Sequence, residues 1–130
     1  MLVLDASVLF EVVADAPAAE SVRQHLDLDE DVAAPHLIDA EVLAVIQTHH
    51  RSGALDATAA AQAVEDLRSW PGERWPHRPF IARAWELRAN VRAYDALYVA
   101  LAEAMDATLL TLDRRLGSAP GPRCEIVVPG

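Results

Sequence analysis

Met1-Leu2-Val3-Leu4-Asp5-Ala6-Ser7 opens the chain: an apolar run, then an aspartate and two small residues. A short apolar run bounded by small and polar residues is typical of a strand buried on both faces. A second such stretch, Thr108-Leu109-Leu110-Thr111-Leu112-Asp113, lies near the other end of the chain. The sequence therefore predicts two buried strands, each with an aspartate at its carboxyl end.

Helices and further strands are expected between and after these two. Ser7 is expected to cap the first helix, and Pro17 to lie in the first turn of the second. The connector 70–79, with its three prolines and a glycine, leaves room for one short strand. The expected helices are 7–13, 17–26, 36–51, 56–67, 80–87 and 94–105, and the other strands are 32–34 and 125–128. Alternating strands and helices predict an α/β fold with a mostly parallel sheet of four or five short strands, flanked by helices on both faces.

Length and composition predict one globular domain spanning residues 1–130. With 52% apolar and 24% charged residues, the chain is neither disordered nor collagen-like. No stretch offers the ~20 uncharged residues that a membrane-spanning helix needs, and the first residues lack the pattern of a signal peptide. Cys124 is the only cysteine, so an internal disulfide is ruled out. We expect a cytoplasmic protein with no membrane partner.

The chain carries a formal net charge of −9 at pH 7. This charge argues against a protein that holds nucleic acid by a broad basic surface, because phosphate binding depends on clustered positive charge. Any contact with nucleic acid must then be local. The acidic run from Asp27 to Asp31 is most simply a solvated loop.

Four acidic residues occupy positions that a solvated surface does not explain. Asp5 and Asp113 each end a buried strand, and the carboxyl ends of parallel strands line the crevice where α/β proteins bind ligands. Helical spacing puts Glu41 beside the apolar stripe of its helix. Asp95 is expected at the start of its helix. Tyr98 follows three residues later on the same helix face, so Asp95 is expected to face inward. We expect these four carboxylates to share one crevice.

Carboxylates gathered in a half-buried crevice repel each other and lose hydration, so positive charge must compensate them. Arg114 and Arg115 follow Asp113 directly and are candidates for structural ion pairs or for contact with RNA phosphate. Hard divalent cations such as Mg²⁺ or Mn²⁺ are the alternative, because all-oxygen ligands select them. Two such ions ~4 Å apart suit phosphodiester hydrolysis. Position and pattern favour the metal site.

Four motifs, in this order along the chain, resemble a known family. They are Val-Leu-Asp-Ala-Ser around Asp5, Asp-Ala-Glu-Val-Leu around Glu41, Ala-Tyr-Asp-Ala-Leu-Tyr-Val-Ala-Leu-Ala-Glu around Asp95, and Leu-Leu-Thr-Leu-Asp-Arg-Arg-Leu around Asp113. The chain resembles the PIN domain, and more narrowly the VapC-type toxins of bacterial VapBC toxin–antitoxin pairs. The resemblance runs from Met1 to the last strand and is least clear over Trp70 to Pro79.

The resemblance implies an α/β/α sandwich and a metal-dependent endoribonuclease that cleaves RNA and arrests growth. It implies that Asp5, Glu41, Asp95 and Asp113 are catalytic and bind one or two Mg²⁺ or Mn²⁺ ions. It also implies that the hydroxyls of Ser7 and Thr111 steady the site. The implied partners are a VapB-type antitoxin, DNA only indirectly through that antitoxin, and a second copy of the chain.

Two helices carry more apolar residues than one buried stripe needs. They are the helices around Ile38 to Ile46 and Asp56 to Leu67. The surplus also favours a homodimer, because a second apolar stripe in a small domain calls for cover by another chain.

The other polar and aromatic candidates have simpler interpretations. Asp39 is expected to face solvent, and Cys124 to be a small apolar residue at a strand edge. The histidines do not form a zinc-ligand pattern, and His49 and His50 are expected at the surface. Trp70 and Trp75 are expected to cover an edge of the core.

Two other functions stay open on the sequence. One is a PIN nuclease that matures RNA and has no antitoxin. The other is a non-catalytic PIN-like binding module whose acidic residues pair with arginines of a partner. A phosphatase or a response-regulator receiver needs paired acidic residues after its first strand. This chain does not have that pair after Leu4, which argues against both functions.

Overall fold

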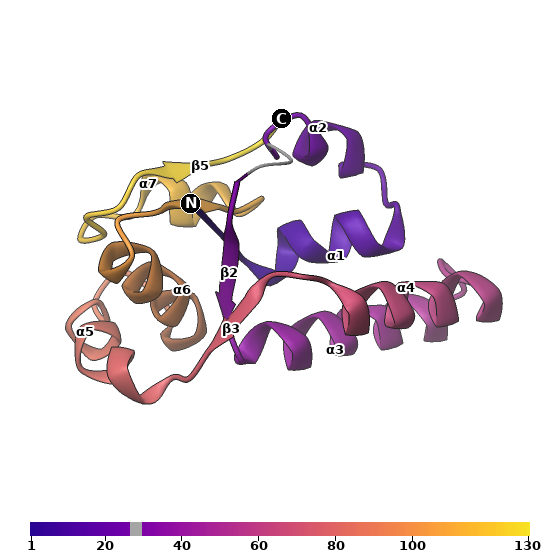
Figure 1. Cartoon of the computed structure of the whole chain (residues 1–130), viewed down its shortest axis with the longest axis horizontal. Helices are drawn as coiled ribbons and strands as arrows, with labels where there is room; N and C mark the ends of the chain where they lie inside the picture. Colours follow the sequence, from indigo (N-terminus) through magenta and orange to yellow (C-terminus); the bar gives the residue numbers. More distant parts are fainter. Residues whose placement is uncertain (27–29) are drawn as a thin grey trace.

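The computed structural model describes residues 1–26 and 30–130 (Figure 1). Most of the acidic run predicted as a solvated loop lies outside these described residues. The elements are β1 (Leu2–Leu4), α1 (Ala6–Ala14), α2 (Ala19–Arg23), β2 (Val32–Pro35), α3 (Leu37–Arg51), α4 (Ala57–Ser69), β3 (Glu73–Trp75), the 3-10 helix η1 (Arg78–Phe80), α5 (Ile81–Glu86), α6 (Ala93–Ala104), β4 (Thr108–Leu110), α7 (Arg114–Ser118) and β5 (Ile126–Val127).

The strands form one five-stranded sheet in the order β3-β2-β1-β4-β5, and every pair is parallel. This confirms the predicted parallel sheet, and β3 is the strand expected in the connector 70–79. In the pairing of the first strand with the fourth, Leu4 lies opposite Leu110. The residues that follow these two strands therefore emerge side by side at the carboxyl edge of the sheet.

Helices cover both faces of the sheet. Figure 1 shows α1, α3 and α4 on one side of the strands. The helices α5 and α6 lie on the other side. The strand order runs outward from β1 to β2 and β3, then returns to β4 on the other side of β1. The crossover direction thus reverses between β1 and β4, and such a switch point opens a crevice at the carboxyl ends of the strands.

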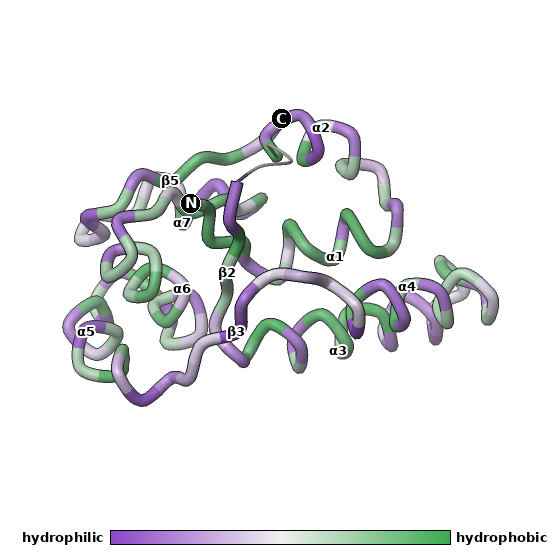
Figure 2. The backbone as a smooth tube through the Cα atoms, viewed as in Figure 1, coloured by the Kyte–Doolittle hydropathy of each residue, from purple (hydrophilic) through white to green (hydrophobic). Residues whose placement is uncertain are grey.

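Apolar residues of the central strands and of α6 form the core. Val3, Leu109, Val99 and Leu101 are fully buried. Figure 2 shows α1 as a mainly hydrophobic helix, and its Leu9 and Phe10 pack into the main core cluster. Burial on both faces explains why the three inner strands, β1, β2 and β4, are mostly apolar rather than alternating.

Three local predictions were wrong. The first helix is capped by Asp5 rather than Ser7, because the Asp5 backbone is extended and its carboxylate accepts from the Val8 amide at 3.2 Å. Pro17 lies in a turn before α2, where the Ala19 amide donates to the Ala16 carbonyl at 2.9 Å. The spacing of apolar residues over 94–105 also predicted Tyr94 on the packed face of this helix, but Tyr94, in the first turn of α6, is 64% exposed.

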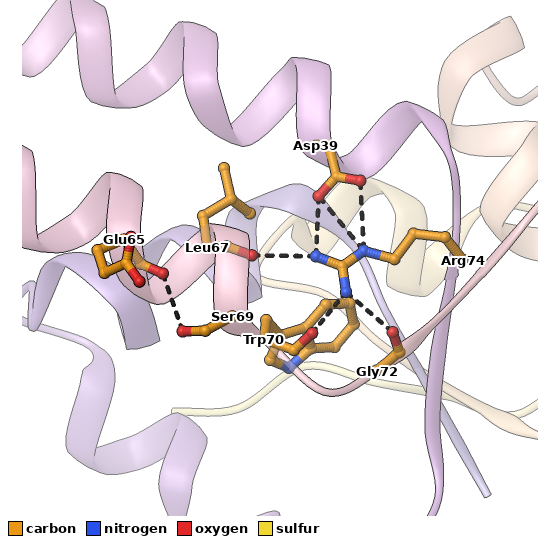
Figure 3. Close-up of polar contacts among 7 residues, drawn as sticks. All are labelled: Asp39, Glu65, Leu67, Ser69, Trp70, Gly72 and Arg74. Atoms are coloured by element: carbon orange, nitrogen blue, oxygen red, sulfur yellow. Dashed lines mark hydrogen bonds and ion pairs between the residues drawn. The ribbon is translucent and has the colours of Figure 1, made fainter.

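An arginine clamp holds the end of α4 against α3 and β3 (Figure 3). The Arg74 guanidinium donates to the carbonyls of Leu67, Trp70 and Gly72 and to the Asp39 carboxylate, with the Nη2 to Oδ1 distance at 3.0 Å. It also lies over the Trp70 ring, 4.8 Å from the centroid. Asp39, predicted to face solvent, is therefore half-exposed and paired. The sequence did not reveal this, because Arg74 lies 35 residues further along the chain.

Among the described residues, no helix has the length and apolar character needed to cross a bilayer.

Candidate active site

The four predicted carboxylates lie along one crevice at the carboxyl ends of the first and fourth strands. The crevice has a volume of about 380 Å³. Asp5 caps α1, Glu41 lies in the second turn of α3, Asp95 in the first turn of α6, and Asp113 caps α7. Ser7, Arg92 and Tyr98 complete the polar part of the lining.

Asp5 is the most buried of these acids, with 5% of its surface exposed. Its carboxylate accepts from the Ser7 hydroxyl at 2.5 Å, from the Val8 amide at 3.2 Å and from the Thr111 hydroxyl. Burial raises the pKa of Asp5 to about 6, although these three hydrogen bonds lower it and stabilise the ionised form. Asp5 is therefore a buried carboxylate held in place by three hydrogen-bond donors.

The hydroxyls of Ser7 and Thr111 join the ends of the two strands. Ser7 Oγ accepts from the Leu112 amide at 3.0 Å, and Thr111 Oγ1 accepts from the Asp113 amide at 3.0 Å. Each hydroxyl thus donates to Asp5 and accepts from the segment that carries Asp113. Both hydroxyls therefore contact Asp5, in the site that the resemblance implies they steady.

Glu41 meets Tyr98 across the crevice. The Tyr98 hydroxyl donates to Glu41 Oε1 at 2.8 Å. Burial raises the pKa of the Glu41 carboxyl, and the Asp95 charge raises it further, against the lowering effect of the Tyr98 hydrogen bond. The spacing of Tyr98 within the helix predicted over 94–105 is typical of a core residue, so the sequence did not indicate this polar contact.

Asp95 is paired with Arg92, one helical turn earlier. Arg92 Nε lies 3.4 Å from Asp95 Oδ2. The pKa of Asp95 is nevertheless raised, because burial and the nearby Asp113 charge outweigh the highly exposed Arg92. Arg92 was missed in the sequence, although its spacing of three residues before Asp95 is a recognisable helical pair.

The sequence left open whether Arg114 and Arg115 pair with the acids or contact RNA phosphate. The Arg115 backbone amide donates to Asp113 Oδ1 at 2.9 Å, and Arg115 lines an adjoining pocket of about 320 Å³ that also contains Arg92, Asp95 and Asp113. Within the described part of the chain, neither arginine's side chain forms an ion pair with a carboxylate. Arg92 takes that role.

The crevice fits a hard divalent cation by its donor chemistry. All of its acidic groups present carboxylate oxygens, and three of the four have raised pKa values, so positive charge would be stabilised there. Across residues 1–26 and 30–130, no three His, Cys, Asp or Glu side chains are already gathered as ligands around one point. Asp5, Glu41, Asp95 and Asp113 are the residues that would hold such an ion.

The remaining candidates lie outside this crevice. His49 is half-buried rather than exposed, with its ring centroid 4.6 Å from that of Phe10, because α1 packs on α3 there. His77 Nε2 accepts from the Leu37 amide at 2.9 Å at the start of α3. Cys124 is a half-buried free thiol, as expected. Trp70 and Trp75 pack against the core as predicted, whereas Trp85 is exposed beneath Arg88.

Comparison with known proteins gives one family and close relatives. A family model described as the PIN domain matches residues 2–122. The chain is 42% identical over 125 residues to a protein of Mycobacterium tuberculosis named Ribonuclease VapC1, covering 95% of this chain and 94% of that one.

Solved structures share the fold at lower identity. FitAcB from Neisseria gonorrhoeae has a TM-score of 0.72 and 20% identity, covering 99% of this chain and 98% of that one. VapBC2 from Rickettsia felis, bound to a DNA fragment from its promoter, has a TM-score of 0.70 and 16% identity, covering 99% and 98%. At these identities the likeness establishes the fold alone.

Proposed function

The chain belongs to the PIN-domain family, in its VapC-type branch, and on that premise we propose that it is an endoribonuclease that hydrolyses phosphodiester bonds of RNA. One observation carries the proposal: four carboxylates from four different elements line one crevice at the switch point of the sheet. A relative with 42% identity named as a ribonuclease supports the same activity.

We propose Mg²⁺ or Mn²⁺ as the cofactor, held by Asp5, Glu41, Asp95 and Asp113. When bound, one or two divalent cations supply Lewis-acid chemistry, which makes water a better nucleophile and offsets charge on the leaving oxygen. Ser7 and Thr111 orient the Asp5 carboxylate for this task. Arg92 and Arg115, at the edge of the crevice, are placed to contact an RNA phosphate, which gives the local basic contact that an acidic chain needs.

Cleavage of RNA by the purified chain tests the proposal. Protein freed of any bound partner is incubated with labelled RNA in Mg²⁺ or Mn²⁺, with EDTA, and with EDTA followed by excess metal. We expect cleavage, its loss in EDTA and its return with metal. Undiminished cleavage in EDTA would contradict the metal-dependent mechanism, and no cleavage in any condition would favour the binding module.

We also propose that the nuclease is the toxin of a type II toxin–antitoxin pair. The name of the Mycobacterium relative supports this assignment. The acidic crevice suits an arginine from an extended segment of the antitoxin, placed where metal would otherwise bind. The net charge of −9 fits contact with DNA only through the antitoxin.

Growth assays separate the toxin from an RNA-maturation nuclease. Expression alone should arrest growth, and co-expression of a small protein encoded beside the gene should restore it. Inhibition of the purified nuclease by that protein should weaken as metal concentration rises. Cleavage of RNA without growth arrest, and without such a neighbouring gene, would favour the maturation nuclease.

We propose a homodimer, supported by two exposed apolar surfaces. The expected second stripe of α3 and α4 leaves Leu43 at 50% and Val64 at 39% exposure along a groove between these helices. The α5–α6 surface exposes Ile81, Trp85 and Tyr94 by 57 to 67%. Sedimentation should give a dimer at micromolar concentration. Leu43→Arg and Trp85→Arg, compared in parallel, identify which surface is buried, and a parent that sediments as a monomer would contradict the proposal.

A further inference from the structure

Tyr98 is a buried phenol whose hydroxyl reaches the crevice. Its side chain is 1% exposed and is among the largest fully buried side chains of the described residues. Its hydroxyl donates to Glu41 Oε1 at 2.8 Å, and the two residues lie 57 positions apart in the sequence. They come from α6 and α3, helices on opposite sides of the sheet (Figure 1). The contact therefore spans the crevice.

The Glu41 carboxylate depends on fewer hydrogen bonds than the Asp5 carboxylate does. Asp5 is held by Ser7, Val8 and Thr111. In residues 1–26 and 30–130, the hydrogen bond from Tyr98 is the only one made to the Glu41 side chain. Glutamate has three rotatable side-chain bonds, so fixing its carboxylate in one place costs conformational entropy that a hydrogen bond must offset. One buried donor thus decides where this carboxylate points.

We propose that Tyr98 is a positioning residue that holds the Glu41 carboxylate in the crevice, with Oε1 occupied and Oε2 free for a divalent cation. This inference rests on the proposed metal-dependent function. Because Tyr98 is buried within α6, it holds the Glu41 carboxylate in place before metal binds. Tyr98 acts through Glu41 and is not itself a ligand.

The decisive experiment measures Mn²⁺ binding directly by calorimetry, using the full chain freed of partner and metal. The test variant is Tyr98→Phe, which removes one oxygen and keeps the shape of the side chain. The control is Tyr94→Phe, the same change one turn earlier on α6 at an exposed position. Loss of an outer contact to a metal ligand typically weakens metal binding about 10–100-fold. We expect that range for Tyr98→Phe and no change for Tyr94→Phe.

A second readout separates positioning from a general structural role. With Tyr98→Phe, the metal concentration for half-maximal RNA cleavage should rise by the same factor as the Kd for Mn²⁺. The rate at saturating metal should stay close to that of the parent. In a Glu41→Gln background, adding Tyr98→Phe should have no further effect on Mn²⁺ binding, because its effect passes through the Glu41 carboxylate.

The outcomes distinguish this inference from the function on which it rests. If the parent does not bind Mn²⁺, or if Glu41→Gln binds it as tightly as the parent, the proposed metal site fails. If the parent binds Mn²⁺ and Glu41→Gln weakens binding while Tyr98→Phe does not, the positioning role of Tyr98 is overturned and the metal site stands. A lower rate at saturating metal with unchanged Mn²⁺ affinity would also overturn it.

Discussion

Thr111 donates a hydrogen bond from its hydroxyl to Oδ2 of Asp5, which lies 106 residues earlier in the chain. The bond joins the carboxyl ends of two neighbouring strands at the switch point of the sheet. Because Thr111 is fully buried, the bond is shielded from water. It holds Asp5 in the orientation on which the proposed site depends.

Thr111→Val should therefore impair both the site and the fold. The change removes a donor to Asp5 and leaves the Asp113 amide without its acceptor, which should lower the free energy of unfolding by about 1–3 kcal/mol. Loss of the donor should also raise the pKa of Asp5 and move the acidic limb of the pH–rate profile to higher pH. Urea unfolding and cleavage rates across pH check this. Thr108→Val, at the start of the same strand, is the control and should leave the acidic limb in place.

The stability of the metal-free chain should depend on pH through Asp5. In the folded chain Asp5 takes up its proton at a pKa of about 6, whereas its ordinary value is 3.8. Between these values the folded state binds more protons than the unfolded state, so stability falls as pH rises. The shift of two pKa units corresponds to about 3 kcal/mol.

Asp5→Asn should remove this dependence. The free energy of unfolding of the variant, minus that of the parent, should rise by about 3 kcal/mol as the pH increases from about 3.5 to about 7. Urea unfolding in EDTA at several pH values measures the difference. Asp106→Asn, at the exposed position before the fourth strand, should track the parent throughout. Parallel curves for parent and Asp5→Asn would mean that the Asp5 pKa is not raised.

Neutral substitutions of the four acids should abolish cleavage without unfolding the chain. The variants are Asp5→Asn, Glu41→Gln, Asp95→Asn and Asp113→Asn, and each should lose about a hundredfold or more in rate. Each should melt no lower than the parent in metal-free buffer, because relief of carboxylate repulsion offsets the lost polar contacts. Asp106→Asn should retain activity, since it lies at the opposite end of the fourth strand from Asp113. A variant that cleaves RNA at the parental rate removes that residue from the site.

Arg74→Met should destabilise the fold. The change removes donors to the Leu67, Trp70 and Gly72 carbonyls and leaves the Asp39 carboxylate unpaired. We expect a loss of about 2–4 kcal/mol in urea unfolding. Arg68→Met is the matched control. Arg68 and Glu65 form an exposed ion pair within α4, so this substitution should change stability little. Equal effects of the two variants would show that the clamp adds no more than a surface ion pair.

The sequence predicted what depends on local pattern. The buried strands at Leu2–Leu4 and Thr108–Leu110 were confirmed because an apolar run between polar and small residues has few other structures open to it. The four carboxylates came together because each follows a strand or opens onto an inward helix face, and parallel strands bring these positions to one edge.

The sequence did not reveal polar contacts between distant segments. Tyr98 has the spacing of a core residue, and only the packing of α6 places its hydroxyl against Glu41. Arg74 lies in a turn-rich connector, so its role in ending α4 depends on where β3 pairs. Ser7 is a plausible helix cap by type, but the extended backbone at Asp5 gives that role to the aspartate.

The central place of β1 in the sheet has a consequence for synthesis on the ribosome. Its two neighbours are β2, which follows within about thirty residues, and β4, which begins only at Thr108. At roughly 5–20 residues per second, a growing chain leaves one edge of its first strand without a partner for several seconds. Asp113 emerges later still, so a partly translated chain contains Asp5 without the residues that complete its surroundings. A nascent chain therefore cannot assemble the crevice with all four carboxylates until translation is nearly finished.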